Sequence, residues 1–149
     1  MIWYADNDII IEFDKKPKVF MRYVYPEMSK DEIEAVVKYP FINNTSLYVN
    51  IHDKRKDVVY SFMIEKGYSW NGADIPLLLW RIIGSKTQPE FLIASLVHDV
   101  LCERRELINR DRKLSSLVFR GLLIEAGVSK FKANLMMFFV DIYQRFCHW

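Results

Sequence analysis

Apolar and polar positions alternate in short stretches through the first 67 residues. Residues 8–13 are rich in isoleucine, and residues 19–25 alternate up to Pro26. Residues 47–52 and 58–65 also alternate, and a charged stretch separates them. Because a period of two is typical of half-buried strands, we expect strands in all of these stretches, the last two paired as an antiparallel hairpin.

One short helix is expected among these strands. Ser29 is followed three residues later by Glu32, which is the spacing of a capping box, and apolar residues then recur at helical spacing up to Pro40. This pattern predicts an amphipathic helix over residues 30–39, ended by the proline.

The second half has a helical period. Helices are predicted over residues 89–103, 109–126 and 129–146, with Gly127 as the C′ residue between the last two. A further apolar run, Leu77 to Ile83, follows a proline and is predicted to be helical. We therefore expect an α+β fold, with a small antiparallel sheet in the N-terminal half and a helical C-terminal half.

Composition limits the classes of protein. A chain of 149 residues has the usual size of one domain, so residues 1–149 are expected to share one core, with strands and one helix in 1–67 and helices in 68–149. The net charge of +2 and the acidic residues interspersed in the basic stretch 104–113 make nucleic acid an unlikely partner. No apolar run reaches the roughly 18–20 residues of a membrane span, and the N-terminus has no signal-peptide pattern.

The residues that point to chemistry lie between Gly67 and Glu103. Asn71-Gly72 predicts a turn, because both residues tolerate positive φ, and Asp74 follows near a predicted helix start. His98 and Asp99 are neighbours on the next helix, about 100° apart around its axis. A metal ion or an activated water between their two faces would use both. Residues predicted to bind at this site are Trp70, Asn71, Gly72, Asp74 and Trp80.

Several interpretations of this site stay open. In one, His98 bonds to the Asn71–Asp74 turn and holds loop and helix together. In another, His98 and Asp99 are catalytic, and with Asp74 they hold a divalent metal ion, the one candidate cofactor. Zinc bound by His98, Cys102 and either Cys147 or His148 is a third. The two cysteines are otherwise expected to be buried thiols, and His52, beside a charged turn, is expected to be a solvated surface residue.

The motifs resemble a known family. The order Asn71-Gly72-Ala73-Asp74-Ile75-Pro76, then Leu79-Trp80 and Ile83-Gly84, then Ala94 to Asp99 is similar to an uncharacterised phage and prophage family, the domain of unknown function numbered 1353. That family reads Asp-Gly-Ala-Ser-Ile-Pro and later Ala-Leu-Ile-His-Asp-Tyr-Leu-Tyr, and it closes on a Gly-Val like Gly127-Val128. The resemblance spans Trp70 to Val128 and implies a phage or prophage origin without an established activity.

At several positions the chain departs from the family pattern, and at some of them it lacks a carboxylate that could bind a cation or act as a base. Asn71 stands where the family has Asp, Asp74 where it has Ser, and Cys102 where it has Tyr. The Ala-Asp pair of the following helix aligns with Ser115-Ser116, so another carboxylate is missing. Asn is a poorer cation ligand than Asp and cannot act as a base, which indicates a rearranged or weakened site.

Three functions follow from these observations. The first is a phage structural or interaction protein, associated with the virion or tail, whose His-Asp pair serves the fold. The second is a small metal-dependent hydrolase that acts on a phosphoester or cell-envelope substrate. The third is a regulator that binds a host protein during infection. The expected partners are proteins, either virion components or a host protein, and an oligomer is left open. The expected location is the cytoplasm of the infected bacterium or the virion.

Overall fold

The larger sheet of the structure, a computed structural model that describes residues 1–72 and 89–145, has four strands. They are β1 (Ile2–Ala5), β2 (Ile9–Phe13), β5 (Leu47–Asp53) and β6 (Val58–Ile64), in the order β1-β2-β5-β6 with every neighbouring pair antiparallel. Buried and exposed side chains alternate along most of β5, so only one face of the sheet meets the core. The predicted strands at 8–13, 47–52 and 58–65 and their hairpin are confirmed.

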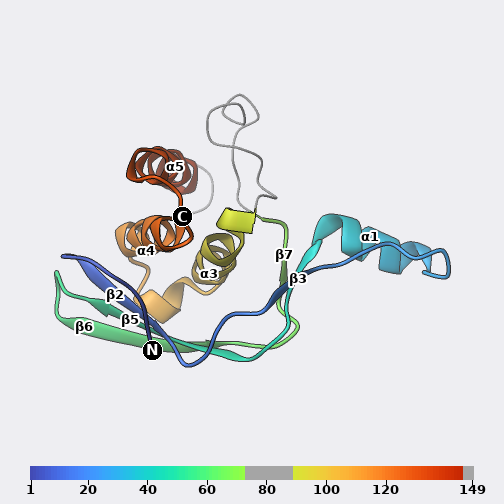
Figure 1. The fold of residues 1–149 in the computed structure, drawn as a ribbon, viewed down its shortest axis with the longest axis horizontal. Helices are drawn as coiled ribbons and strands as arrows, with labels where there is room; N and C mark the ends of the chain where they lie inside the picture. Colours follow the sequence, from blue (N-terminus) through green and yellow to red (C-terminus); the bar gives the residue numbers. More distant parts are fainter. Residues whose placement is uncertain (73–88, 146–149) are drawn as a thin grey trace.

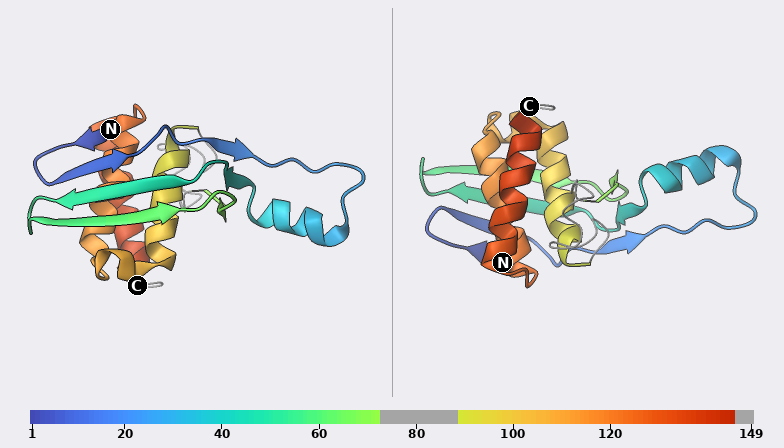
Figure 2. Two further views of the ribbon diagram at one scale, coloured as in Figure 1. Left: turned by 90° about the horizontal axis from the view of Figure 1, so that it is seen from below. Right: turned by 90° about the horizontal axis from the view of Figure 1, so that it is seen from above.

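Helices cover the buried face of this sheet. They are η2 (Pro89–Phe91), α3 (Leu92–Glu103), η3 (Arg105–Ile108), α4 (Arg112–Glu125) and α5 (Lys130–Tyr143). Helices α3 and α4 lie across the sheet, and α5 packs on the side of α4 away from it (Figures 1 and 2). The α+β class is therefore confirmed, with antiparallel sheets in the N-terminal half and most helices in the C-terminal half.

Helix boundaries follow local backbone signals. The helix predicted from residue 109 begins at Arg112, because Asn109 and Arg110 have positive φ of 56° and 59° and Asp111 caps the helix through the Leu114 N–H. Gly127 has a φ of 101°, as a C′ glycine should. The run Leu77–Ile83 lies outside the described residues.

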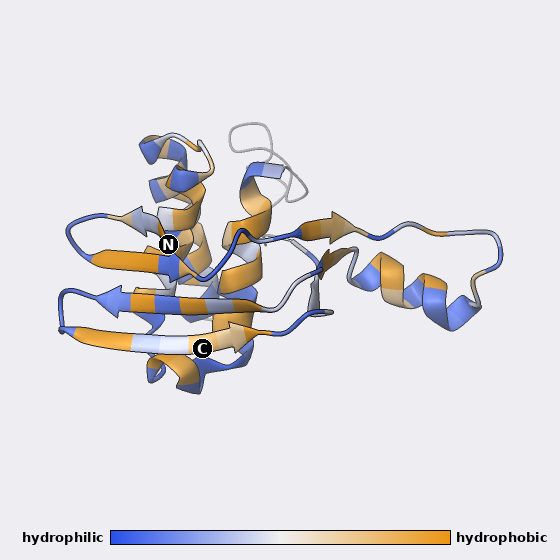
Figure 3. Cartoon of the chain, turned by 60° about the horizontal axis from the view of Figure 1, so that its bottom comes forward, coloured by the Kyte–Doolittle hydropathy of each residue, from blue (hydrophilic) through white to orange (hydrophobic). Residues whose placement is uncertain are grey.

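Residues 19–43 form an arm that projects from the core (Figures 1–3). The arm contains β3 (Val19–Met21), α1 (Lys30–Lys38) and β4 (Phe41–Asn43), and β4 also pairs with β7 (Ser69–Trp70) to give a small sheet of order β3-β4-β7. The N-cap half of the predicted capping box is present, since the Ser29 hydroxyl accepts from the Glu32 N–H at 3.2 Å, and the Glu32 carboxylate bonds back to that hydroxyl rather than to the Ser29 backbone. The predicted helix 30–39 is thus confirmed to within one residue.

The strand predicted over 19–25 is shorter than expected. Its pairing with β4 reaches Arg22, whose N–H donates to the carbonyl of Pro40. Pro40 has no N–H to donate to the carbonyl of Arg22, so the hydrogen-bond ladder stops there. The chain then turns, with the Met28 N–H bonded to the Tyr25 carbonyl.

Buried side chains join the two sheets and the helices into one core. Asn43 ties the small sheet to the end of β6, because its amide donates to the carbonyls of Ile64 and Glu65 at 3.4 and 3.0 Å. Among residues 1–72 and 89–145, no helix is long and apolar enough to cross a membrane. His52 lies near the surface as expected, with Nε2 3.2 Å from an Asp57 carboxylate oxygen.

Candidate functional site

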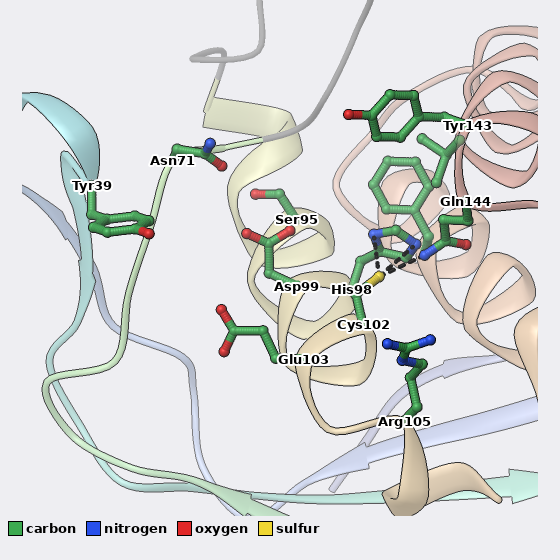
Figure 4. Close-up of a pocket in the computed structure, with 12 residues that line it drawn as sticks. Tyr39, Asn71, Ser95, His98, Asp99, Cys102, Glu103, Arg105, Tyr143 and Gln144 are labelled. Carbon is green, nitrogen blue, oxygen red and sulfur yellow. Dashed lines mark hydrogen bonds between the residues drawn. The ribbon is translucent and has the colours of Figure 1, made fainter. Parts of the chain in front are cut away.

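A cleft runs along α3 (Figure 4). The small sheet and the arm border it on one side of that helix, and α5 borders it on the other. Its volume is about 340 Å³, well above the roughly 10–15 Å³ that one water molecule requires. Helix α3 supplies five of the described lining residues, more than any other element, and the rest come from the arm, the residue after β7, η3, α4 and the C-terminal part of α5. The described lining residues are Tyr39, Asn71, Ser95, His98, Asp99, Cys102, Glu103, Arg105, Phe119, Val140, Tyr143 and Gln144.

The helical period divides the α3 residues into two rows. His98 and Cys102 are four residues apart and face α5, whereas Asp99 and Glu103 face the side of Asn71 (Figure 4). His98 and Asp99 therefore diverge, as expected for adjacent helical residues. A ligand that contacts both must lie across the helix rather than on one face of it.

His98 is nearly buried, with 8% of its surface exposed. Its ring centroid lies 5.0 Å from that of Phe119, and its two ring nitrogens lie 3.7 and 3.8 Å from the Cys102 sulfur. Burial lowers the pKa of His98 to about 4, and a side-chain hydrogen bond with Gln144 offsets only part of that shift. His98 is therefore a neutral imidazole at pH 7.

The thiol of Cys102 sits between two polar neighbours. The Gln144 amide donates to its sulfur, and His98 lies on the preceding helical turn. A neutral imidazole does not supply the positive charge that lowers a thiol pKa in a cysteine nucleophile. The His98–Cys102–Gln144 group therefore links α3 to the end of α5 and has the character of a packing contact.

The other row gives its side of the cleft a negative character. Asp99 and Glu103 lie on one face of α3, near Tyr68. Burial raises the pKa of the Tyr68 phenol, and the charges of Glu103 and Asp99 raise it further. Arg104 forms a salt bridge with Glu65, the residue that follows β6. The guanidinium carbon of Arg104 lies over the Tyr68 ring, 5.7 Å from the ring centroid.

Only some of the hypothesised metal ligands lie within the described residues. Asp74, its third member, lies outside the described residues, as do Trp80 and the zinc alternatives Cys147 and His148. Within residues 1–72 and 89–145, no three His, Cys, Asp or Glu side chains are placed to hold a metal ion. A metal at His98 or Asp99 would need a ligand from the remaining residues.

Comparison with known proteins identifies the family of this fold. The family model described as "Protein of unknown function (DUF1353)" matches residues 47–140, more than half of the chain. The chain belongs to the DUF1353 family. No curated protein and no solved structure matches it. The DUF1353 match runs from β5 into α5, so it includes most of the cleft lining and leaves the arm outside.

The residues singled out in the sequence occupy different places in this DUF1353 member. Asn71, His98 and Asp99 line the cleft, and their role as a site stays a prediction. Trp70 is buried beneath it, and its Nε1 donates to the Ser95 hydroxyl at 2.9 Å. Gly72 has the positive φ that the sequence suggested, 94°, and the rest of the predicted turn lies outside the described residues.

Ser116, where the DUF1353 pattern has Asp, lies away from the cleft lining. It is buried, and its hydroxyl donates at 3.1 Å to Asp141, a carboxylate that also pairs with Arg112. A carboxylate is thus present beside this position, supplied by α5 and engaged in holding α4 and α5 together. The pair Ser115-Ser116 serves helix packing here.

Some lining residues were not identified from the sequence. Glu103 could have been found, because it follows Asp99 at the four-residue spacing of one helix face. Gln144 and Tyr143 could not, since only the packing of α5 on α4 brings them to α3. Tyr39 enters the lining because the arm returns to the core at this point.

The arm presents a second candidate surface. Residues 20–25 expose Tyr23, Tyr25, Phe20 and Val24 by 64%, 59%, 52% and 51%. On α1, only Val36 is buried, and Val37 is 71% exposed. Figure 3 shows apolar residues along both β3 and α1, where the arm stands clear of the core. Large apolar side chains grouped in this way mark interaction sites.

Proposed function

We propose that this DUF1353 member is an interaction protein that binds a protein partner through its arm. The observation that supports this most directly is the exposed apolar surface of residues 20–25, on an element that projects from the core. Aromatic side chains of this kind are enriched among residues that dominate binding energy.

The arm is poorly explained by the needs of the fold alone. Its root is fixed by β4 and β7, with Phe41 and Asn43 fully buried. Beyond the root, Arg22 holds α1 through the carbonyls of Tyr39 and Ala35. The chain thus orders the arm's backbone and still leaves its large side chains in solvent, at a cost in conformational entropy that burial there does not offset.

The biological setting of this proposal rests on the family resemblance. A phage or prophage origin, and association with a virion or tail, would place a small protein with an exposed binding arm inside an assembly. The cleft residues then serve the fold, with neutral His98 packed between α3 and α5. A host protein as the partner is the alternative outcome of the same experiments.

Arm variants test the proposal in the phage or prophage that encodes the chain. Tyr23→Ser/Tyr25→Ser should keep the thermal stability of the protein, because both side chains are solvent-exposed. It should weaken the affinity for the partner at least tenfold, the effect of losing about 1.4 kcal/mol of binding energy, and thereby lower the yield of infectious particles. Tyr48→Ser, at a side chain 56% exposed on the open face of the larger sheet, is the matched control and should complement fully. Full complementation by the arm variant would refute the proposal.

A small hydrolase is the second candidate, and the cleft favours it. A volume of about 340 Å³ lined by both His98 and Asp99 provides the space for water that a mere packing contact lacks. His98 is neutral, so it can accept a proton, and Asp99 can bind a cation. The low pKa of His98 makes it a weak base, which places this candidate second.

Calorimetric titration with zinc, manganese and calcium tests this second candidate. If it is right, the wild-type chain binds one metal stoichiometrically, and both His98→Ala and Asp99→Ala abolish the binding while remaining folded. His52→Ala, at a histidine far from the cleft lining, is the control and should bind normally. A wild-type chain that binds none of the three metals eliminates the metal-dependent reaction.

A further inference from the structure

The backbone of β3 has one unpaired edge. The carbonyl of Lys18 accepts a bond from residue 44 at 2.8 Å, and the N–H of Arg22 donates to residue 40 at 2.7 Å, so these residues direct their backbone groups at β4. Because the direction alternates along a strand, the groups of Val19 and Met21 point the other way. No strand within residues 1–72 and 89–145 pairs with that edge, since β3 ends the order β3-β4-β7.

Residues 19–25 carry no lysine, proline or bulge, which are features that protect many natural edge strands from pairing with another chain. One protective feature is present, since β3 itself has three residues. Residues 19–25 contain one charged residue, Arg22, and its guanidinium is held by carbonyls at the C-terminal end of α1. Met21, Tyr23 and Val24 are exposed beside the edge.

We propose that β3 pairs in antiparallel fashion with β3 of a second copy of this chain, across a two-fold axis at Met21. The pairing joins two small sheets of order β3-β4-β7 into one continuous sheet. The inference rests on the proposed function, because it names the partner that the arm binds. A two-fold axis lets the same edge serve both copies, so one strand is enough for a closed dimer.

The charges select this register. With the axis at Met21, Phe20 lies opposite Arg22 of the second copy, where an aromatic ring and a guanidinium attract each other. An axis at Val19 would place Lys16 opposite Arg22 of the second copy, two like charges. An axis at Tyr23 would require pairing beyond Tyr25, where the chain turns. Met21 is therefore the one outward-facing centre that suits both charge and backbone.

Disulfide trapping tests the register. In a full-length chain with Cys102 and Cys147 replaced by serine, Met21→Cys should form a covalent dimer on mild oxidation, because the facing Cα atoms of a bonded pair lie about 5.5 Å apart. Tyr25→Cys is the matched control. Its two copies would lie eight residues apart, about 27 Å at roughly 3.4 Å per residue, and should stay monomeric. Equal cross-linking of both variants, or of neither, would overturn the proposed pairing.

Sedimentation of the unmodified chain adds a second criterion. The wild type should be dimeric, and Met21→Pro should dissociate at least tenfold more readily, because it removes an outward N–H while the bonds from β3 to β4 remain. A wild-type monomer overturns the pairing. If Tyr23→Ser/Tyr25→Ser still abolishes particle yield in that case, the proposed function stands with a different partner. If the wild type is a dimer and Tyr23→Ser/Tyr25→Ser still complements fully, the β3 pairing is supported and the proposed function is refuted.

Discussion

Trp70→Ala should lower the free energy of unfolding by about 4 kcal/mol, the usual cost of removing a fully buried tryptophan. Trp70 is 1% exposed and packs against Phe41 and Tyr68, with ring centroids 5.8 and 6.4 Å away. Its Nε1 donates to Ser95 of α3. The side chain thus connects the small sheet to the helix that carries the cleft.

Urea unfolding of the purified protein measures this effect, with Trp70→Phe as the control. Phenylalanine keeps an aromatic ring in the site and loses the bond to Ser95, so its cost should be about 1–2 kcal/mol. At roughly 2–4 °C per kcal/mol, Trp70→Ala should lower Tm by about 10 °C. A loss below about 1 kcal/mol would mean that Trp70 does not join sheet and helix in this way.

Acid should destabilise the protein through His98. The pKa of this group is about 4 when folded and 6.5 when unfolded, so protonation favours the unfolded chain. The stability from a neutral His98 is fully present above pH 6.5 and is lost progressively between pH 6.5 and 4. A difference of about 2.5 pKa units corresponds to about 3 kcal/mol.

The comparison with His98→Gln isolates this contribution. The free energy of unfolding of the wild type, relative to His98→Gln, should fall by about 3 kcal/mol between pH 7 and pH 4. His52→Gln, at a partly exposed histidine, is the control because it leaves His98 in place. A wild-type curve that parallels His98→Gln would contradict the burial of a neutral imidazole.

The longer elements of this fold were predictable because their periodicity is strong. The hairpin at 47–65 and the helices after residue 89 carry enough repeats to define a period. Strands β1, β4 and β7 were missed, since two to four residues cannot establish alternation. The start of α4 was misplaced because the positive φ of Asn109 and Arg110 depends on the turn they form.

The site was predictable only where it is local. Asn71, His98 and Asp99 were identified from nearby positions and do line one cleft. Gln144 reaches it through the packing of α5 and had no local signature. The arm could not be predicted from the sequence for a different reason. The sequence shows that Phe20 and Tyr23 are aromatic, and only the tertiary structure shows that nothing in the described core covers them.

If the chain acts through its arm, site-specific photo-cross-linking from the arm should capture the partner. A photoreactive phenylalanine analogue would replace Tyr23 in one experiment and Tyr48 in another, in cells that produce the chain. These side chains have similar exposure, 64% and 56%, on different surfaces. We expect one defined covalent adduct from Tyr23 and none from Tyr48. An adduct from Tyr48 alone would contradict this expectation.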